Sequence, residues 1–191
     1  MYIVFDIDEV LNNLLITTFR LAGIDERKVK MIRKYNIRKS NILTVEEADR
    51  ISELWKYGST YEACAPAYGI GRISRIANTE GVNVINHSLC ENIDAARSKI
   101  NWVSRHMDTT NIKFIMEIKK KTPIIDADVV VEDNLEYLMN YRKGVKLLID
   151  KTYNKDEEYG IKTSDYGILR MNTTYDAIRY IEELIGVGEY R

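Results

Sequence analysis

The chain has 191 residues, of which 45% are hydrophobic and 30% charged, and 28 basic against 29 acidic residues give a formal net charge of −1. This composition is typical of a globular protein of about one domain and excludes disorder as its main state. No run approaches the roughly 20 apolar residues of a membrane-spanning helix, so we expect no membrane association. The balanced charge offers nucleic acid no bulk attraction.

Cysteine content and the first residues predict where the protein resides. Cys64 and Cys90 are its two cysteines, and they form no Cys-x-x-Cys pair. We therefore expect a reduced, cytoplasmic protein without a disulfide framework or a structural zinc. Asp6 and Asp8 interrupt the first apolar stretch, so a secretory signal is not expected.

The first predicted element is a strand that ends in two carboxylates. Residues 2–5 are Tyr-Ile-Val-Phe, and Asp6 and Asp8 follow directly. An apolar run with β-branched residues is typical of a strand buried on both faces of a parallel sheet. Residues 11–22 then carry apolar side chains at helical spacing and stop at Gly23, which predicts a helix with a glycine C-cap.

Residues 24–75 are more polar and mostly helical in pattern. The sequence Thr-Val-Glu-Glu at 44–47 is a capping box, and it predicts a helix that runs to Trp55. Residues 58–71 contain glycines and tyrosines that predict a loop with short helical pieces. We interpret residues 12–75 as a helical cap inserted into a core of residues 1–11 and 76–191.

After Gly81 strands and helices alternate. The expected strands are residues 82–85, 112–118, 128–132 and 145–149, and the expected helices are residues 91–106, 134–141 and 174–185. This alternation predicts an α/β fold, Rossmann-like, with a mostly parallel sheet flanked by helices and joined by right-handed crossovers.

Acidic and hydroxyl side chains follow three of these strands. Asp6 and Asp8 come after the first strand, Ser88 after the second, and Glu132 and Asp133 after the fourth. Each alone is explained by turn or helix-cap chemistry. Together they converge at one sheet edge, where four carboxylates need a cation. Hard oxygen ligands favour Mg²⁺, and Mg²⁺ beside a lysine and a hydroxyl predicts a phosphoryl site.

Four motifs, taken together, resemble a known superfamily. They are Phe-Asp-Ile-Asp-Glu-Val-Leu at 5–11, a strand closed by Ser88, Lys121 within Lys-Lys-Lys-Thr-Pro at 119–123, and Ala-Asp-Val-Val-Val-Glu-Asp at 127–133. The chain resembles the haloacid-dehalogenase-like phosphatases, and among them the 5'(3')-deoxyribonucleotidase or cytosolic 5'-nucleotidase type C family. Softer similarities are Lys-x-x-Trp at 99–102 and Tyr-Asn at 153–154.

The resemblance implies a Mg²⁺-dependent phosphomonoester hydrolase, most simply a 5'-nucleotidase acting on nucleoside monophosphates. It assigns Asp6 as the nucleophile that forms an aspartyl-phosphate, and Asp8 as the general acid and base. The implied metal ligands are Asp6, Asp133 and the backbone carbonyl of Asp8. Glu132 is implied to act on the metal site through these ligands, without binding the metal directly. The implied phosphate-binding residues are Ser88, Lys121 and Lys99.

The chain departs from the family pattern at one position, and three consecutive lysines are candidates for the lysine of the third motif. Glu9 stands where the family usually has glycine, and its carboxylate either perturbs the metal site or points to solvent. The lysine of the third motif is expected at Lys121, with Lys119 and Lys120 as alternatives.

Substrate choice is expected to depend on the cap. Trp55, Tyr57, Tyr61 and Tyr68 either contact a compact substrate such as a nucleobase or form the cap's own core. The basic run at 27–39 is a solvated helix face or a path for a phosphate backbone. The alternative functions are therefore a phosphatase for nucleic-acid ends or for another small metabolite, and a non-catalytic binding protein.

Overall fold

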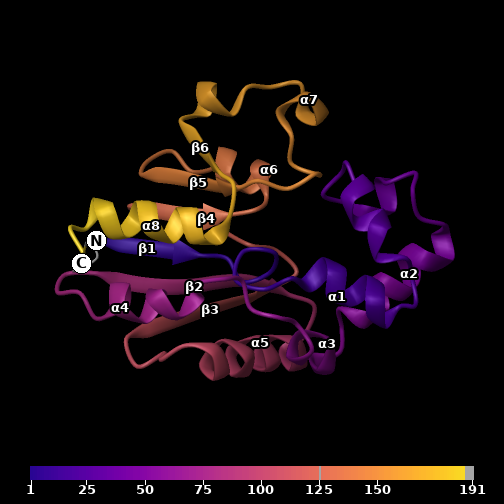
Figure 1. Ribbon diagram of the computed structural model, residues 1–191, viewed down its shortest axis with the longest axis horizontal. Helices are drawn as coiled ribbons and strands as arrows, with labels where there is room; N and C mark the ends of the chain where they lie inside the picture. The colour runs from indigo at the N-terminus through magenta and orange to yellow at the C-terminus, as the bar shows by residue number, and fades with distance from the viewer. Residues whose placement is uncertain (125, 188–191) are drawn as a thin grey trace.

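A six-stranded sheet lies at the centre of the protein (Figure 1), whose computed structural model describes residues 1–124 and 126–187. The strand order is β3-β2-β1-β4-β5-β6, and every neighbouring pair is parallel. The strands are β1 (Tyr2–Phe5), β2 (Asn83–Cys90), β3 (Ile112–Ile118), β4 (Val129–Glu132), β5 (Val145–Ile149) and β6 (Ile168–Met171). This sheet confirms the predicted α/β class.

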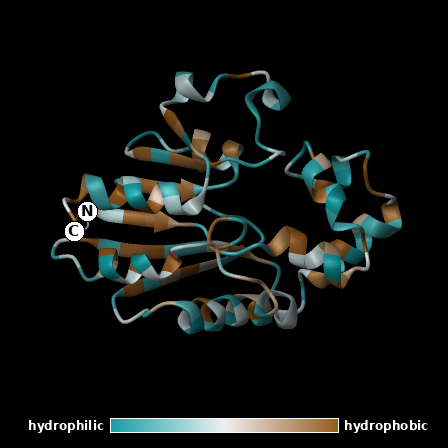
Figure 2. Cartoon of the chain, in the orientation of Figure 1, coloured by the Kyte–Doolittle hydropathy of each residue, from teal (hydrophilic) through white to brown (hydrophobic). Residues whose placement is uncertain are grey.

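Helices cover both faces of the sheet because its strands are apolar on both sides. Ile3 and Phe5 belong to one cluster with residues of α4, α5 and α8, whereas Val4 packs with α6 on the opposite face. Figure 2 shows the strands as mostly hydrophobic and the outer helix surfaces as mixed. The helices are α1 (Leu14–Leu21), α2 (Val45–Leu54), α3 (Gly58–Glu62), α4 (Ile73–Ala77), α5 (Ile93–His106), α6 (Leu135–Met139), α7 (Asp156–Tyr159) and α8 (Thr174–Leu184).

The segment between β1 and β2 packs in two different ways. Its first part, with α1 and α2, extends beyond the end of the sheet toward which β1 runs (Figure 1). It holds a hydrophobic cluster that includes Phe19, Ile32 and Ile51, and Tyr153 joins this cluster from outside the segment. Its second part packs on the main core, since α3 lies against α5 and Ile73 and Ile76 belong to the β1 cluster. The division into a core and a cap at residues 11 and 76 stays a prediction.

Three local expectations need correction. The helix expected from residue 11 begins at Leu14, because Asn12 Oδ1 accepts hydrogen bonds from Glu9 N and Leu14 N and holds a turn there. The second strand runs to Cys90 rather than residue 85, because β3 pairs with it from Val84 to Cys90, so Ser88 lies inside the strand. Strand β6 was not expected, since four residues at a sheet edge carry no periodic signal.

The capping box expected at residues 44–47 is confirmed. The Thr44 side chain accepts from Glu47 N and the Glu47 carboxylate accepts from Thr44 N, at the start of α2. Within residues 1–124 and 126–187, no helix has the length and apolar character needed to cross a membrane.

Candidate active site

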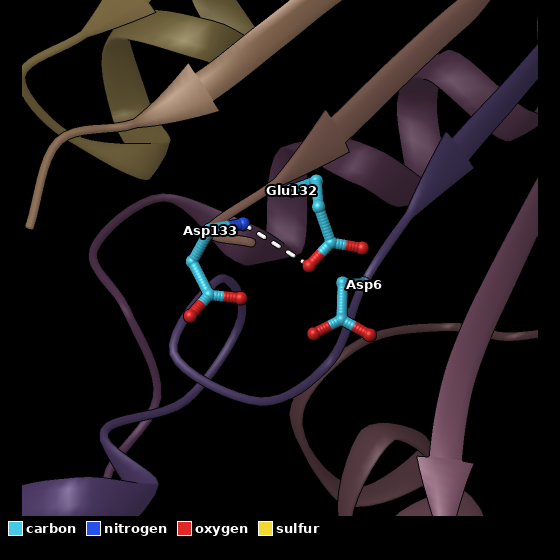
Figure 3. Close-up of side chains that lie close together, drawn as sticks. All are labelled: Asp6, Glu132 and Asp133. Atoms are coloured by element: carbon cyan, nitrogen blue, oxygen red, sulfur yellow. Dashed lines mark hydrogen bonds between the residues drawn. The ribbon is translucent and has the colours of Figure 1, made fainter. Parts of the chain in front are cut away.

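Strand register brings three carboxylates together at the carboxyl edge of the sheet. Phe5 of β1 pairs with Val131 of β4, and Asp6 N donates to Val131 O at 3.0 Å. Asp6 after β1, and Glu132 and Asp133 at the end of β4, are therefore neighbours at the carboxyl edge of the sheet. Between β1 and β4 the strand order changes direction, and this is where open α/β sheets bind their ligands. Figure 3 shows these side chains around a common space, and each offers an oxygen within 4.8 Å of the others. All three are buried.

Lys121 partly neutralises this cluster. Its Nζ lies 2.6 Å from Asp6 Oδ1 and 2.5 Å from Glu132 Oε2, while Lys119 and Lys120 are exposed. Burial disfavours the ammonium, but the charges of Asp6 and Glu132 outweigh burial and raise the pKa of Lys121. Of the three candidate lysines, Lys121 is thus the one in contact with the acidic cluster.

The cluster retains more negative charge than one lysine balances. Burial, followed by the charge of Glu132, raises the pKa of Asp6 to about 6, although Lys121 opposes this. Burial and the charges of Glu132 and Asp6 raise the pKa of Asp133 well above its ordinary value. The pKa of a buried carboxyl group rises in this way when its negative charge is not fully balanced by a nearby positive charge. The arrangement would therefore be stabilised by a cation.

A second group of polar side chains lies beside the cluster and comes from α5 and β2. Lys99 is almost fully buried and donates to the Asp8 carboxylate, to Ser88 Oγ at 3.0 Å and to Leu89 O at 2.5 Å. Burial raises the pKa of Asp8, and Lys99 opposes that shift. Three sequence-predicted residues, Asp8, Ser88 and Lys99, are thus brought into direct contact.

The turn after β5 orients Asp133. Tyr153 Oη donates to Asp133 Oδ2 at 2.6 Å, and Asn154 Nδ2 donates to the backbone oxygens of Asp133 and Ile149, each at 2.8 Å. Arg170 of β6 donates to Asn154 Oδ1 and O at 3.1 and 2.5 Å. The unexpected sixth strand therefore stabilises the turn that holds an active-site acid.

The donor set fits a hard divalent cation such as Mg²⁺. Among the residues that the structure describes, none donates a hydrogen bond to Asp6 Oδ2 or Asp133 Oδ1, which leaves one carboxylate oxygen on each of these buried residues for an ion. Glu132 differs, because Oε1 accepts from the backbone of Asp133 and Asn134, and Oε2 accepts from Lys121. Glu132 is placed to orient its neighbours rather than to bind an ion directly.

A cavity of about 430 Å³ lies between the sheet edge and the insert. Asp8, Lys99 and Asp133 line it from the sheet side, and Trp55 and Tyr61 line it from the other side. Its remaining lining residues include Glu9, Leu14, Leu15, Tyr35, Asn36, Ile37, Arg38, Ser52, Leu89, Glu91 and Tyr153. The volume lies within the usual range of small-molecule sites.

Comparison with known proteins identifies the family. The model of the family described as "5' nucleotidase, deoxy (Pyrimidine), cytosolic type C protein" matches residues 1–166. The chain belongs to this family. It is accordingly a haloacid-dehalogenase-like phosphatase of the nucleotidase type, as the sequence motifs predict.

Two solved structures are similar to this chain, and the first of them supports the fold. A Thermotoga maritima protein assigned as a beta-phosphoglucomutase is similar with a TM-score of 0.55 and 10% identity, over 96% of this chain and 99% of that chain. Cytosolic 5'-nucleotidase IIIB bound to cytidine gives a TM-score of 0.47 and 11% identity, over 98% and 85% of the two chains. No curated protein matches the sequence.

The four cap aromatics predicted to meet the substrate are not equivalent. Trp55 and Tyr61 line the cavity, and Tyr61 Oη donates to Trp55 O at 2.7 Å. Tyr57 is half exposed and binds Glu53, and Tyr68 is 81% exposed against Tyr175. Neither Tyr57 nor Tyr68 is part of the cavity lining. The role of these aromatic residues toward a substrate stays a prediction.

The Glu9 side chain is only 16% exposed, so it does not simply point to solvent, and its effect on a metal site stays a prediction. Its φ of 57° is in the left-handed region that favours the glycine usual in this family. Its carboxylate accepts from Leu15 N at 2.6 Å, at the start of α1, and pairs with Lys151 Nζ at 3.0 Å. A capped helix N-terminus and an ion pair offset the backbone strain.

Tyr35 is a cavity residue that the sequence analysis missed. Its ring lies 5.9 Å from that of Tyr153 at an angle of 70°, which places a residue of the insert beside the tyrosine that binds Asp133. Tyr35 lies within a basic run without a motif, so no sequence signal separates it from the chain's other tyrosines.

The basic run at 27–39 is largely neutralised by neighbours. Lys28 pairs with Glu47 at 2.7 Å, and Lys34 pairs with Glu158 at 3.2 Å. Arg27 and Arg38 pair with Asp25 and Asp49 in the same way. Ion pairs of this kind favour the solvated surface over a continuous path for a phosphate backbone.

Proposed function

We propose that this protein hydrolyses nucleoside monophosphates with Mg²⁺ and through a phosphorylated Asp6. One observation carries the proposal: Asp6 and Asp133 lie close together, each has a carboxylate oxygen that accepts no hydrogen bond from the described residues, and Lys121 Nζ lies 2.6 Å from the other oxygen of Asp6. A nucleophile, an ion site and an anion-binding lysine thus lie together at the carboxyl edge of the sheet, and Asp133 of this group lines the cavity.

In the proposed first step, an oxygen of Asp6 attacks phosphorus in line, and the bond from phosphorus to the ester oxygen breaks. Asp8 gives its proton to the leaving oxygen, and burial raises the pKa of Asp8 in the direction that this role requires. Lys121, Lys99 and Ser88 contact the non-bridging oxygens and offset their charge.

In the second step Asp8, now ionised, takes a proton from a water molecule as that water attacks phosphorus. The bond between phosphorus and Asp6 breaks, inorganic phosphate leaves, Asp6 is again a free carboxylate, and Asp8 is again protonated. Asp6, Asp133 and the backbone carbonyl of Asp8 would hold Mg²⁺, which supplies positive charge to the transferring phosphoryl group.

The cavity suits a compact phosphomonoester. Its sheet side is charged and its insert side is aromatic and polar, with Trp55 and Tyr35 beside Asn36 and Ser52. Such a wall can stack on a nucleobase and form hydrogen bonds to its edge. Tyr61 is better placed for support, because its hydroxyl binds Trp55 O and its ring lies 4.8 Å from Lys99 Nζ. The family description supports a deoxypyrimidine nucleotide and a cytosolic location.

The test is a panel of deoxyribonucleoside and ribonucleoside monophosphates, sugar phosphates and a 5'-phosphorylated oligonucleotide, assayed with Mg²⁺ and with EDTA. We expect phosphate release from mononucleotides, fastest with deoxypyrimidines, and none with EDTA. A preference for sugar phosphates or for the oligonucleotide would overturn the substrate assignment, and full activity in EDTA would overturn the metal assignment. Rapid acid quench and mass spectrometry should find the phosphoryl group on the peptide that contains Asp6.

A further inference from the structure

The loop that carries Lys121 is held by side chains rather than by secondary structure. It follows β3, and Lys119 has a φ of 78°, a left-handed conformation that is unfavourable for a lysine. Thr122 N donates to Glu117 Oε2 at 2.7 Å, Tyr137 Oη donates to Thr122 O at 3.0 Å, and Ile124 N donates to Tyr141 Oη at 3.2 Å. Three backbone groups next to Lys121 thus depend on side-chain partners.

His87 connects the partners of this loop. Its ring is fully buried, with Nε2 2.6 Å from Glu117 Oε2 and Nδ1 3.2 Å from Tyr137 Oη. Burial and the charge of Lys121 lower the pKa of His87, against the effect of Glu117. A neutral ring that donates from Nε2 to Glu117 accepts from Tyr137 at Nδ1, a tautomer inferred from these partners.

Glu117 completes the network as a carboxylate. Burial opposes its charge, but the hydrogen bonds from Thr122 and His87 lower the pKa of Glu117. The hydroxyl of Tyr137 has one proton and three hydrogen-bond partners, His87 Nδ1, Thr122 O and Tyr141 Oη, so each partner affects the others.

The network also contacts the functional end of Lys121. Lys121 Nζ lies 4.6 Å from the centre of the Tyr137 ring, which stabilises the buried cation in addition to Asp6 and Glu132. Tyr137 therefore binds the backbone of the residue after Lys121 and the ammonium of Lys121 itself. A shift of this tyrosine would move the ammonium relative to Asp6.

We propose that His87, Glu117 and Tyr137 form a clamp that positions Lys121 for phosphoryl transfer. The inference rests on the proposed function, since it assigns Lys121 to the transferring phosphoryl group. The clamp residues are positioning residues, because their hydrogen bonds go to one another, to Tyr141 and to the loop. An ammonium that stabilises developing charge must be held within a fraction of an ångström, which a loop with strained backbone does not achieve alone.

The decisive test is a double-mutant cycle with Tyr137→Phe and Lys121→Ala, assayed with 4-nitrophenyl phosphate and Mg²⁺. Tyr137→Phe keeps the ring beside Lys121 and removes the hydroxyl. We expect it to lower kcat about tenfold with KM changed less than about twofold, which corresponds to about 1.4 kcal/mol of transition-state stabilisation. In the Lys121→Ala background, Tyr137→Phe should have no further effect on kcat.

The matched control is Tyr180→Phe, on the helix α8, which should leave kcat unchanged. A second readout is independent of turnover: in Tyr137→Phe and in Glu117→Gln, the amides of Thr122 and Ile124 should exchange hydrogen faster, and those of β1 should not. Equal losses of kcat with and without Lys121, or unchanged exchange at Thr122, would overturn the clamp. An inactive wild-type protein would instead overturn the proposed function, and hydrogen exchange would then decide on the clamp alone.

Discussion

The two walls of the cavity are built in different ways. On the sheet side, Asp8, Lys99 and Asp133 line the cavity. Asp133 and the adjacent Asp6 follow paired parallel strands, are buried, and have charged or hydrogen-bonding neighbours on several elements. On the insert side, Tyr35 comes from a loop, Ser52 from α2 and Trp55 from the end of α2, and Trp55 packs against a smaller hydrophobic cluster. Buried charged groups must be held in fixed positions by their neighbours, whereas the aromatic residues of the insert can be substituted with less effect on the fold. Chemistry and substrate choice should therefore respond separately to mutation.

The largest expected effect comes from the sheet wall. Asp6→Asn removes the nucleophilic oxygen while keeping the shape, so kcat for 4-nitrophenyl phosphate should fall about a thousandfold or more. Circular dichroism and thermal unfolding should show a folded protein. An Asp6→Asn variant that turns over at the wild-type rate would refute the assignment of the nucleophile.

The buried charge of Asp6 should also make stability depend on pH. Because the pKa of Asp6 is raised from 3.8 to about 6 in the folded state, the folded protein binds more protons than the unfolded chain between these values. The contribution of Asp6 to the free energy of unfolding should therefore fall as pH rises from about 4 to about 6, by at most about 3 kcal/mol.

Urea unfolding in EDTA checks this, with Asp6→Asn as the reference that does not titrate. The wild type should lose stability relative to Asp6→Asn across that range, and Mg²⁺ should raise its melting temperature more at pH 7.5 than at pH 5. A constant difference between the two proteins would show that the charge of Asp6 is already balanced by Lys121.

Trp55 tests the insert wall. Trp55→Ala removes an aromatic surface from the cavity and should raise KM for a preferred nucleotide about tenfold, with kcat for 4-nitrophenyl phosphate changed less than about twofold. Tyr57→Ala, a neighbouring aromatic outside the cavity lining, is the control and should change neither value. Equal loss of kcat on both substrates with Trp55→Ala would show that the two walls are not separable.

The smallest effects are expected at the two capping boxes, which allow the insert and the main core to be compared. Thr44→Ala at α2 and Thr173→Ala at α8 remove the same interaction from the insert and from the main core. Each should cost about 1 kcal/mol of local stability. Hydrogen exchange should show Thr44→Ala loosening α2 and Thr173→Ala loosening α8, with kcat unchanged for both. If Thr44→Ala loosened the sheet as well, the insert and the core would form one cooperative unit.

The sequence by itself determined the elements whose signals are local. The apolar runs before Asp6 and Glu132 predicted buried strands, and the box at Thr44 predicted the start of α2. It also predicted that acids would gather at one sheet edge, because parallel strands end at a common edge whatever their length. The short edge strand β6 was not predicted, because its hydrogen bonds to β5, and not a hydrophobic pattern in its own residues, make it a strand.

Only the tertiary structure decided which side chains meet. Lys121 reaches Asp6 across 115 residues of sequence, and Lys99 reaches Asp8 across 91. Such pairs depend on strand register, on how α5 packs and on a loop held by distant side chains, and none of these leaves a periodic signal. Local patterns predict local conformation, whereas the positions of charged groups come from the packing of the whole chain.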